Sequence, residues 1–255
     1  MIYIATHKKF LPPRLEGYIP IQVGAEGKEK LGYLTDNTGE NISSKNPNFC
    51  ELTGIYWIWK NRSDEYKGLV HYRRYFGKSN LRNNFSDIYS YDELVEMLDC
   101  VDVVLPYVER FKQNARDEIL ISCCTEEAFG KLEEIIKEKY PEYIIVFKTY
   151  FSNNKSSLFN MMFCRKEVFD EYSEWLFDIL FELEKSMDLN ALDEYRKRLY
   201  GFLAERLLNI WIAKKKLRVK HVCVVHTEMP LLDRLQLMRR RLTNGFIYSL
   251  TKRWF

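Results

Sequence analysis

The sequence lacks the short motifs that identify the commonest nucleotide-binding and hydrolytic enzymes. It contains no P-loop, no Gly-x-Gly-x-x-Gly fingerprint, no Gly-x-Ser-x-Gly elbow and no His-Glu-x-x-His pair. Its six cysteines form no Cys-x-x-Cys pair, and the adjacent Cys123 and Cys124 have a poor spacing for zinc. We therefore expect no metal site, and unbridged thiols of the kind found in a reduced, cytoplasmic chain.

Long apolar runs and a strong excess of charge of one sign are also missing. No apolar run approaches the roughly 18–20 residues that a membrane span needs, and no basic segment followed by an apolar one indicates a signal peptide. The 255 residues include 39 Lys and Arg against 36 Asp and Glu, which argues against a dedicated nucleic-acid binder. Hydrophobic residues make up 46%, so the chain can bury a sizeable core.

Hydrophobic periodicity predicts strands and helices that alternate along the chain, as in an α/β fold. The expected strands cover residues 2–6, 67–70, 101–106, 158–164 and 218–225. The expected helices cover residues 48–61, 91–99, 126–140, 165–187 and 195–216. Residues 24–48 are expected to form a long loop, residues 107–125 show no clean period, and residues 142–151 fit a strand or a helix. Asn48 and Glu51 have the spacing of a helix capping box.

Two of the expected strands are followed by polar side chains. Thr6, His7 and Lys8 end the first strand, and His71-Tyr72-Arg73-Arg74 follows the strand at 67–70. In open α/β sheets, ligands bind beyond the carboxyl ends of strands, and guanidinium groups suit phosphate recognition. Tyr72 or His71 could stack on a base or bond a sugar hydroxyl. The alternatives are a solvated basic turn and a basic, aromatic strand edge.

Three further polar residues interrupt apolar segments. Asn160 lies inside an expected strand, where it is either a satisfied structural amide or a ligand contact. Arg206 falls on the apolar side of the helix at 195–216, with Glu205 beside it. A charge on an apolar face must be paired or must line a cleft, so this pair either serves a site or joins an internal ion pair.

The C-terminal tail is basic and amphipathic. From residue 231 onward, Asp233 is the only acidic residue against six basic ones, and apolar residues are interleaved with them. The basic residues are Arg234, Arg239, Arg240, Arg241, Lys252 and Arg253. This composition is typical of a membrane-surface anchor. A tail packed on its own domain is the alternative, and nucleic-acid binding is a weaker third one.

Several blocks together resemble a bacterial glycosyltransferase family found in capsular and exopolysaccharide gene clusters. The blocks are residues 2–10, 18–25, 31–36, 41–43, 46–53, 56–61, 68–76, 159–161, 174–177 and 201–208. The His-Tyr-Arg-Arg-Tyr segment at 71–75 is the most specific of them, and the resemblance extends to about residue 226.

The resemblance implies a single GT-A-like nucleotide-sugar-binding domain over residues 1–228, with a mixed central sheet flanked by helices. Residues 229–255 would be the basic tail. The implied reaction moves a hexosyl unit, galactose in its pyranose or furanose form, from UDP to a lipid-diphosphate-linked oligosaccharide. The protein would then be cytoplasmic and peripheral at the inner face of the cell membrane. It would require no cofactor besides the nucleotide-sugar donor and would not bind nucleic acid.

The donor would be held by residues that follow the expected strands at 2–6 and 67–70. We expect Thr6, His7 and Lys8 to cradle uridine and ribose. Arg73 and Arg74 would neutralise the diphosphate in place of a metal ion. The sequence supports this substitution because it contains no Asp-x-Asp pair after a strand, with which metal-dependent sugar-nucleotide transferases commonly hold their ion.

The sugar and the reacting groups would be served by the remaining candidates. Asn160 is expected to bond a sugar hydroxyl. Glu205 is the expected general base on the acceptor hydroxyl, with His71 as the alternative base. Arg206 would hold the leaving diphosphate or orient Glu205.

One segment departs from the family pattern. Residues 122–128 read Ser-Cys-Cys-Thr-Glu-Glu-Ala, where the family often has a His and an acidic pair. A non-catalytic glycan- or lipid-binding module of a polysaccharide assembly complex is therefore the alternative function.

Overall fold

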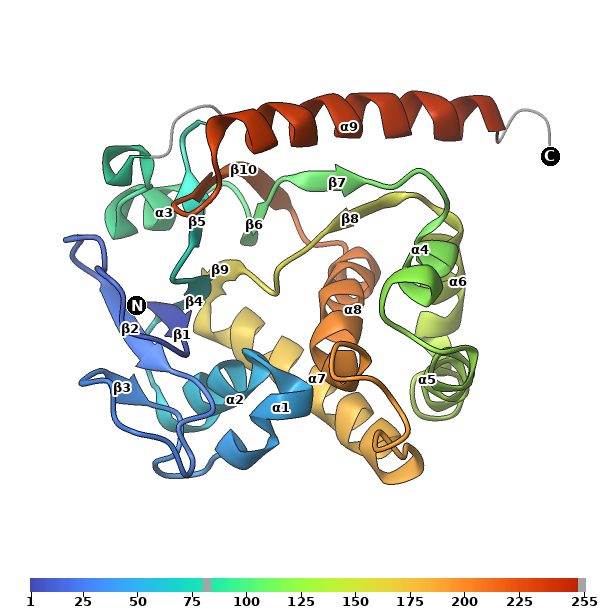
Figure 1. Ribbon diagram of the computed structural model, residues 1–255, viewed down its shortest axis with the longest axis horizontal. Coiled ribbons are helices and arrows are strands. Elements are labelled where there is room, and N and C mark those ends of the chain that lie inside the picture. The colour runs from blue at the N-terminus through green and yellow to red at the C-terminus, as the bar shows by residue number, and fades with distance from the viewer. Residues whose placement is uncertain (80–83, 252–255) are drawn as a thin grey trace.

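The computed structural model describes residues 1–79 and 84–251, and its centre is a mixed eight-stranded sheet (Figure 1). The strand order is β3-β2-β1-β4-β5-β10-β6-β9. The strands are β1 (Ile2–Thr6), β2 (Tyr18–Gln22), β3 (Leu34–Thr35), β4 (Tyr66–His71), β5 (Arg74–Gly77), β6 (Val103–Pro106), β9 (Met162–Arg165) and β10 (Val219–His226). The prediction of an α/β fold with a mixed central sheet is confirmed.

Part of this sheet closes on itself. β9 pairs with both β6 and β4, so β4, β5, β10, β6 and β9 form a five-stranded barrel. Gly68 of β4 lies opposite Phe163 of β9, where an added Cβ atom would stand 2.8 Å from the Met162 carbonyl oxygen. A side chain at residue 68 would therefore push the two strands apart, which explains the glycine.

The remaining three strands extend the sheet as a parallel wing. β1 pairs in parallel with β2 and with β4, and β2 pairs in parallel with β3. All five residues of β1 are buried, because alternate side chains enter different cores on the two faces of the sheet. Such a strand reads as a continuous apolar run, as the sequence analysis assumed.

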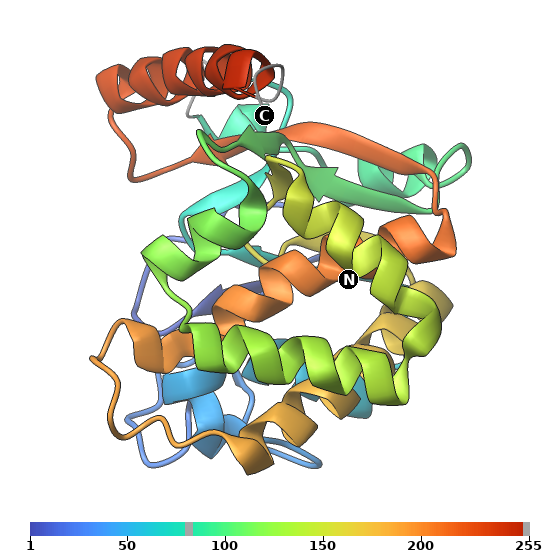
Figure 2. The same cartoon turned by 90° about the vertical axis from the view of Figure 1, so that its right-hand side faces the viewer.

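Helices cover the sheet unequally. The larger core holds the buried side chains of α2 (Leu52–Asn61), α7 (Lys166–Ser186) and α8 (Leu199–Lys215), and α3 (Tyr91–Met97) packs into the smaller core. Three more helices, α4 (Ala115–Ser122), α5 (Glu126–Lys139) and α6 (Ile144–Ser152), stand beside α8 (Figures 1 and 2). The ambiguous segment 142–151 is thus mainly helix.

Two sequence predictions about local structure are wrong. The helix expected over 48–61 is broken into α1 (Asn46–Phe49) and α2, because Cys50 adopts a positive φ of 53°. Asn48 therefore caps nothing, and its side-chain amide donates to the Lys197 carbonyl. The strand expected over 158–164 is also interrupted: β8 (Lys155–Ser157) and β9 flank a turn in which Phe159 and Asn160 both have positive φ.

The C-terminal segment forms α9 (Leu231–Thr251), which lies along one edge of the molecule outside the sheet (Figures 1 and 2). It packs on β7 (Val108–Arg110), the partner of β8 in a small second sheet. The alternative in which the tail packs on its own domain is therefore confirmed for one face of this helix. The tail residues Lys252, Arg253, Trp254 and Phe255 lie outside the described residues.

Candidate active site

A cavity of about 680 Å³ lies at the carboxyl ends of β1 and β4. These parallel strands are neighbours, with Ala5 opposite His71, so the segments that follow them meet at one edge of the sheet. The turn between β8 and β9 and the start of α8 complete the wall. Of the sequence candidates, the cavity is lined by Thr6, His7, His71, Tyr72, Arg73, Arg74, Glu205 and Arg206. Lys8 and Asn160 do not line it.

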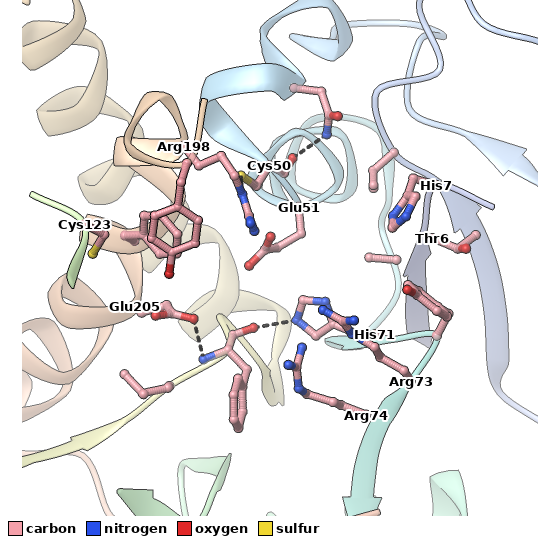
Figure 3. Close-up of a pocket in the computed structure, with 18 of the residues that line it drawn as sticks. Thr6, His7, Cys50, Glu51, His71, Arg73, Arg74, Cys123, Arg198 and Glu205 are labelled. Atoms are coloured by element: carbon pink, nitrogen blue, oxygen red, sulfur yellow. Dashed lines mark hydrogen bonds between the residues drawn. The ribbon is translucent and has the colours of Figure 1, made fainter. Parts of the chain in front are cut away.

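Three arginines face this cavity without a carboxylate partner in the described part of the chain: Arg73, Arg74 and Arg198 (Figure 3). The Arg74 guanidinium lies over the Phe159 ring at 4.6 Å, and its buried Nε has no hydrogen-bond partner. Burial and the neighbouring Arg73 lower the pKa of Arg74. Guanidinium groups that lack a carboxylate partner and gather in one cavity, one of them partly buried, favour an anionic ligand.

Arg198 is a candidate that the sequence analysis missed. It lies just before α8, where its Nε donates to the Cys50 sulfur at 3.3 Å and its guanidinium lies 5.1 Å from the Phe202 ring. Three consecutive basic residues at 196–198 gave no periodic signal that distinguishes one from the others. Only the fold separates Arg198 from Arg196, which pairs with Asp193 and does not line the cavity.

Glu205 and Arg206 belong to a buried ion-pair network. Arg206 donates to Glu205 through Nη1 and to Glu118 of α4 through Nη2, each at 2.6 Å, and it is 3% exposed. The other carboxylate oxygen of Glu205 accepts the Phe159 backbone N–H at 2.9 Å. Burial raises the pKa of Glu205, against the opposing effect of Arg206. Arg206 thus joins an internal ion pair, which is one of the two alternatives that the sequence left open. Both Glu205 and Arg206 also line the cavity.

Glu51 is the second candidate that the sequence analysis missed. The sequence predicts that Glu51 belongs to a capping box, but its side chain points into the cavity (Figure 3). Its Oε1 accepts from the Asn160 amide at 2.8 Å, and its Oε2 has no hydrogen-bond partner within the described residues. The positive φ of Cys50 turns the chain between α1 and α2 and so places the carboxylate there.

Asn160 occupies the wall behind Glu51 and not the cavity itself. Its Nδ2 donates to Glu51 and to the Gly201 carbonyl, and the residue is 2% exposed. The expected contact with a sugar hydroxyl has no path through this geometry, because other protein groups surround the amide. Asn160 instead positions the Glu51 carboxylate.

His71 is held by the turn between β8 and β9. Its Nε2 lies 2.6 Å from the Phe159 carbonyl oxygen. A carbonyl only accepts, so the shared proton lies on Nε2, and Nδ1 is the acceptor of the neutral ring. Burial lowers the pKa of His71, which favours this neutral form.

The segment after β1 is divided between structural and accessible groups. The Thr6 hydroxyl donates to the Lys8 carbonyl at 2.6 Å and so closes the turn. His7 is exposed and lies edge-on to the Tyr72 ring, 5.4 Å between centroids. The Lys8 ammonium is paired with Glu228 at 3.0 Å and is 4.7 Å from the Tyr72 ring. The rings of His7 and Tyr72 are therefore available to a ligand. Lys8 does not line the cavity, and its ammonium lies beside the Tyr72 ring.

The segment that departs from the family pattern borders the same cavity. Ser122 and Cys123 are among its lining residues, and burial raises the pKa of Cys123 to about 11, so its sulfur is a neutral thiol. Within residues 1–79 and 84–251, no group of three or more His, Cys, Asp or Glu side chains is arranged to hold a metal ion.

A solved structure and a family model both match this chain. The apo structure of the bifunctional glycosyltransferase WbbM superposes with a TM-score of 0.80 at 30% sequence identity over 89% of this chain. The match covers 45% of the WbbM chain, so the present chain spans about half the length of that protein. No curated protein is significantly similar. The fold is therefore like that of part of a glycosyltransferase.

The family model matches residues 1–216, which include β1, the arginines and every residue of the cavity wall named above. Its description, Domain of unknown function (DUF4422), assigns no activity. The match ends before β10 and α9, and it includes the other seven strands of the central sheet and the residues that line the cavity. The chain belongs to the DUF4422 family.

Proposed function

We propose that this chain is a glycosyltransferase of GT-A-like architecture that takes a hexosyl unit from a UDP-linked donor. The observation that carries the proposal is the cluster of Arg73, Arg74 and Arg198 in one cavity at the carboxyl ends of two parallel strands. A diphosphate bears the negative charge that such a cluster lacks. The similarity to part of WbbM supports sugar transfer over other reactions of nucleoside diphosphates.

The donor is proposed to lie along the sheet edge. His7 and Tyr72 would stack on the uracil or contact the ribose, with Thr6 holding their turn closed. The three guanidinium groups would neutralise the diphosphate and stabilise the charge that develops on it as the bond to the sugar breaks. Galactose, in the pyranose or furanose form, is the proposed sugar, and a lipid-diphosphate-linked saccharide is the proposed acceptor.

Glu51 is proposed as the general base. In a direct displacement, the free oxygen of Glu51 would take the proton of the acceptor hydroxyl. The hydroxyl oxygen would at the same time bond to the anomeric carbon, and UDP would leave. Glu205 was the base expected from sequence, but Arg206 and the Phe159 N–H occupy both of its oxygens. Neither oxygen of Glu205 is thus left without a hydrogen-bond donor, whereas one oxygen of Glu51 is, within the described part of the chain. Glu205 is therefore proposed to position the turn that carries Phe159.

The test is turnover with a set of donors. Purified protein is incubated with UDP-galactose, UDP-glucose, UDP-N-acetylglucosamine or GDP-mannose and a bacterial extract of lipid-linked saccharides. Release of UDP and radiolabel in the lipid fraction measure transfer. Transfer from one UDP-hexose, and none from GDP-mannose, is expected. If UDP compounds bind but no donor is turned over, the chain is a glycan- or lipid-binding module and the proposal is wrong.

A further inference from the structure

The helix α9 has two different faces. Its inner face is fixed to the body by polar contacts: Arg241 forms a two-point ion pair with Glu109 at 2.8 and 2.9 Å, and its guanidinium lies 3.4 Å from the Tyr107 ring centre. Asn244 also donates to the Arg110 carbonyl. Bidentate, partly buried pairs of this kind hold an element in one orientation. The rotation of α9 about its axis is therefore set, and so is the face that it presents outward.

The outer face is apolar. Of the eleven large hydrophobic side chains that are exposed in the described residues, six lie on this helix, each of them more than 40% exposed. They are Leu231, Leu232, Leu235, Leu242, Phe246 and Leu250. At 100° per residue these side chains form a stripe on one side of the helix, opposite Arg241. No other element lies beyond α9 in either view (Figures 1 and 2).

Positive charge accompanies this stripe. Arg239 and Arg240 are exposed, and neither makes an ion pair with any residue in the described ranges. The whole segment from residue 231 has six basic residues and one acidic residue. An apolar stripe bordered by unpaired arginines complements an anionic lipid surface, whereas a second copy of this helix would bring like charges together.

The length and polarity of α9 suit a helix that lies on a bilayer and does not cross it. Its 21 residues extend roughly 31 Å, but no helix of the described chain is apolar enough over its length to span a membrane. A second cavity of about 420 Å³ opens beneath it, lined by Arg240 and Asn244 from α9 and by Arg74 and Phe159 from the candidate site. A helix lying on the bilayer would bring this second cavity close to the lipid surface.

We propose that the outer face of α9 docks the protein on anionic lipid bilayers. The apolar stripe enters the headgroup region, and Arg239, which projects from the same side of the helix, contacts the lipid phosphates. The docking does not require sugar transfer, so it can be tested separately from the proposed function. If both hold, the second cavity is the path by which a lipid-carried acceptor reaches Arg74.

The test is co-sedimentation of the full chain with sucrose-loaded vesicles. Vesicles of phosphatidylglycerol and phosphatidylcholine are compared with vesicles of phosphatidylcholine alone. Phe246→Asp is compared with Gln236→Asp, which adds the same negative charge at an exposed position outside the stripe. We expect Phe246→Asp to weaken binding to the anionic vesicles at least tenfold and Gln236→Asp to change it much less. Arg239→Gln should weaken it about fivefold.

Three results would overturn the proposal. They are failure of the unmodified chain to sediment with anionic vesicles, equal binding by Phe246→Asp and Gln236→Asp, and a dimer in sedimentation velocity that Phe246→Asp dissociates. The last would assign the stripe to a second copy of the chain. UDP binding by Phe246→Asp, measured in parallel, is expected to be unchanged, and this shows that the variant is folded.

Discussion

At the scale of single residues, the candidate site separates carboxylates that hold structure from one that is free to react. Glu118 and Glu205 both neutralise Arg206, whose burial requires them. Glu51 uses one oxygen on Asn160 and leaves the other toward the cavity. This difference in hydrogen bonding, and not proximity to the arginines, distinguishes the proposed base.

Substitution of the two carboxylates tests this distinction. We expect Glu51→Gln to lower turnover by about 10²-fold or more, because the amide cannot accept the hydroxyl proton. Glu205→Gln should lower it less than tenfold, since the amide oxygen can still accept the Phe159 N–H. Steady-state UDP release from the active donor measures both. The opposite order, with Glu205→Gln inactive and Glu51→Gln active, would restore Glu205 as the base.

His226 gives a prediction about pH. Burial, with the nearby Arg74 and Arg241, lowers the pKa of His226 from 6.5 to about 4. The unfolded chain therefore binds a proton between these pH values that the folded chain does not, so stability falls as the pH falls through this window. The contribution lost between pH 7 and pH 5 is about 2 kcal/mol at 1.36 kcal/mol per pKa unit.

Urea unfolding at the two pH values measures this contribution. His226→Gln removes the titrating group, so the variant should lose about 2 kcal/mol less of its unfolding free energy between pH 7 and pH 5 than the unmodified chain. Identical losses in the two proteins would mean that His226 is protonated in the folded state.

The sequence could identify most, but not all, of the site. His71 to Arg74 were found because they follow an apolar strand directly, and the parallel pairing of β1 and β4 brings them beside His7. Glu51 and Arg198 could not be found in this way. Their side chains reach the cavity through the positive φ of Cys50 and the docking of the segment before α8, and neither feature has a periodic pattern.

At the scale of elements, the apolar helices and strands were predictable and their interruptions were not. The apolar stripe of α7, the largely buried sequence of α8 and the apolar run of β1 predict these elements because burial favours one local structure for each. The break at Cys50 and the turn at Phe159 and Asn160 lie inside apolar segments, where tertiary contacts override local preference. The barrel closure by β4 and β9 joins strands about 95 residues apart, which local patterns do not report.

Two Gly→Ala substitutions test that closure. Gly68→Ala places a methyl group 2.8 Å from the Met162 carbonyl oxygen and should lower the unfolding free energy by about 2 kcal/mol. Gly130→Ala, in α5, meets nothing within 4 Å and should raise it by about 0.5–1 kcal/mol. Urea unfolding measures both. Because the unfolded chain loses similar freedom in each, equal effects would show that β4 and β9 are not closely paired.

At the scale of the whole molecule, an arginine-lined cavity and an amphipathic helix lie on opposite sides of a shared wall. Arg74 lines both the candidate active site and the second cavity beneath α9. The proposed donor pocket thus lies at the parallel edge of the sheet, and the proposed approach of the acceptor is from the side of α9. This arrangement is what the proposed transfer between a water-soluble donor and a lipid-carried acceptor requires.

The most direct test of the central claim is calorimetric titration of UDP in the presence of EDTA. We predict that UDP binds without a divalent ion, and that Arg73→Gln and Arg198→Gln each weaken binding about tenfold or more. Arg196→Gln, two residues from Arg198 but outside the cavity, should bind UDP as the unmodified chain does. No UDP binding without a metal ion, or equal binding by all three variants, would contradict the claim that this arginine cluster is a nucleoside-diphosphate site.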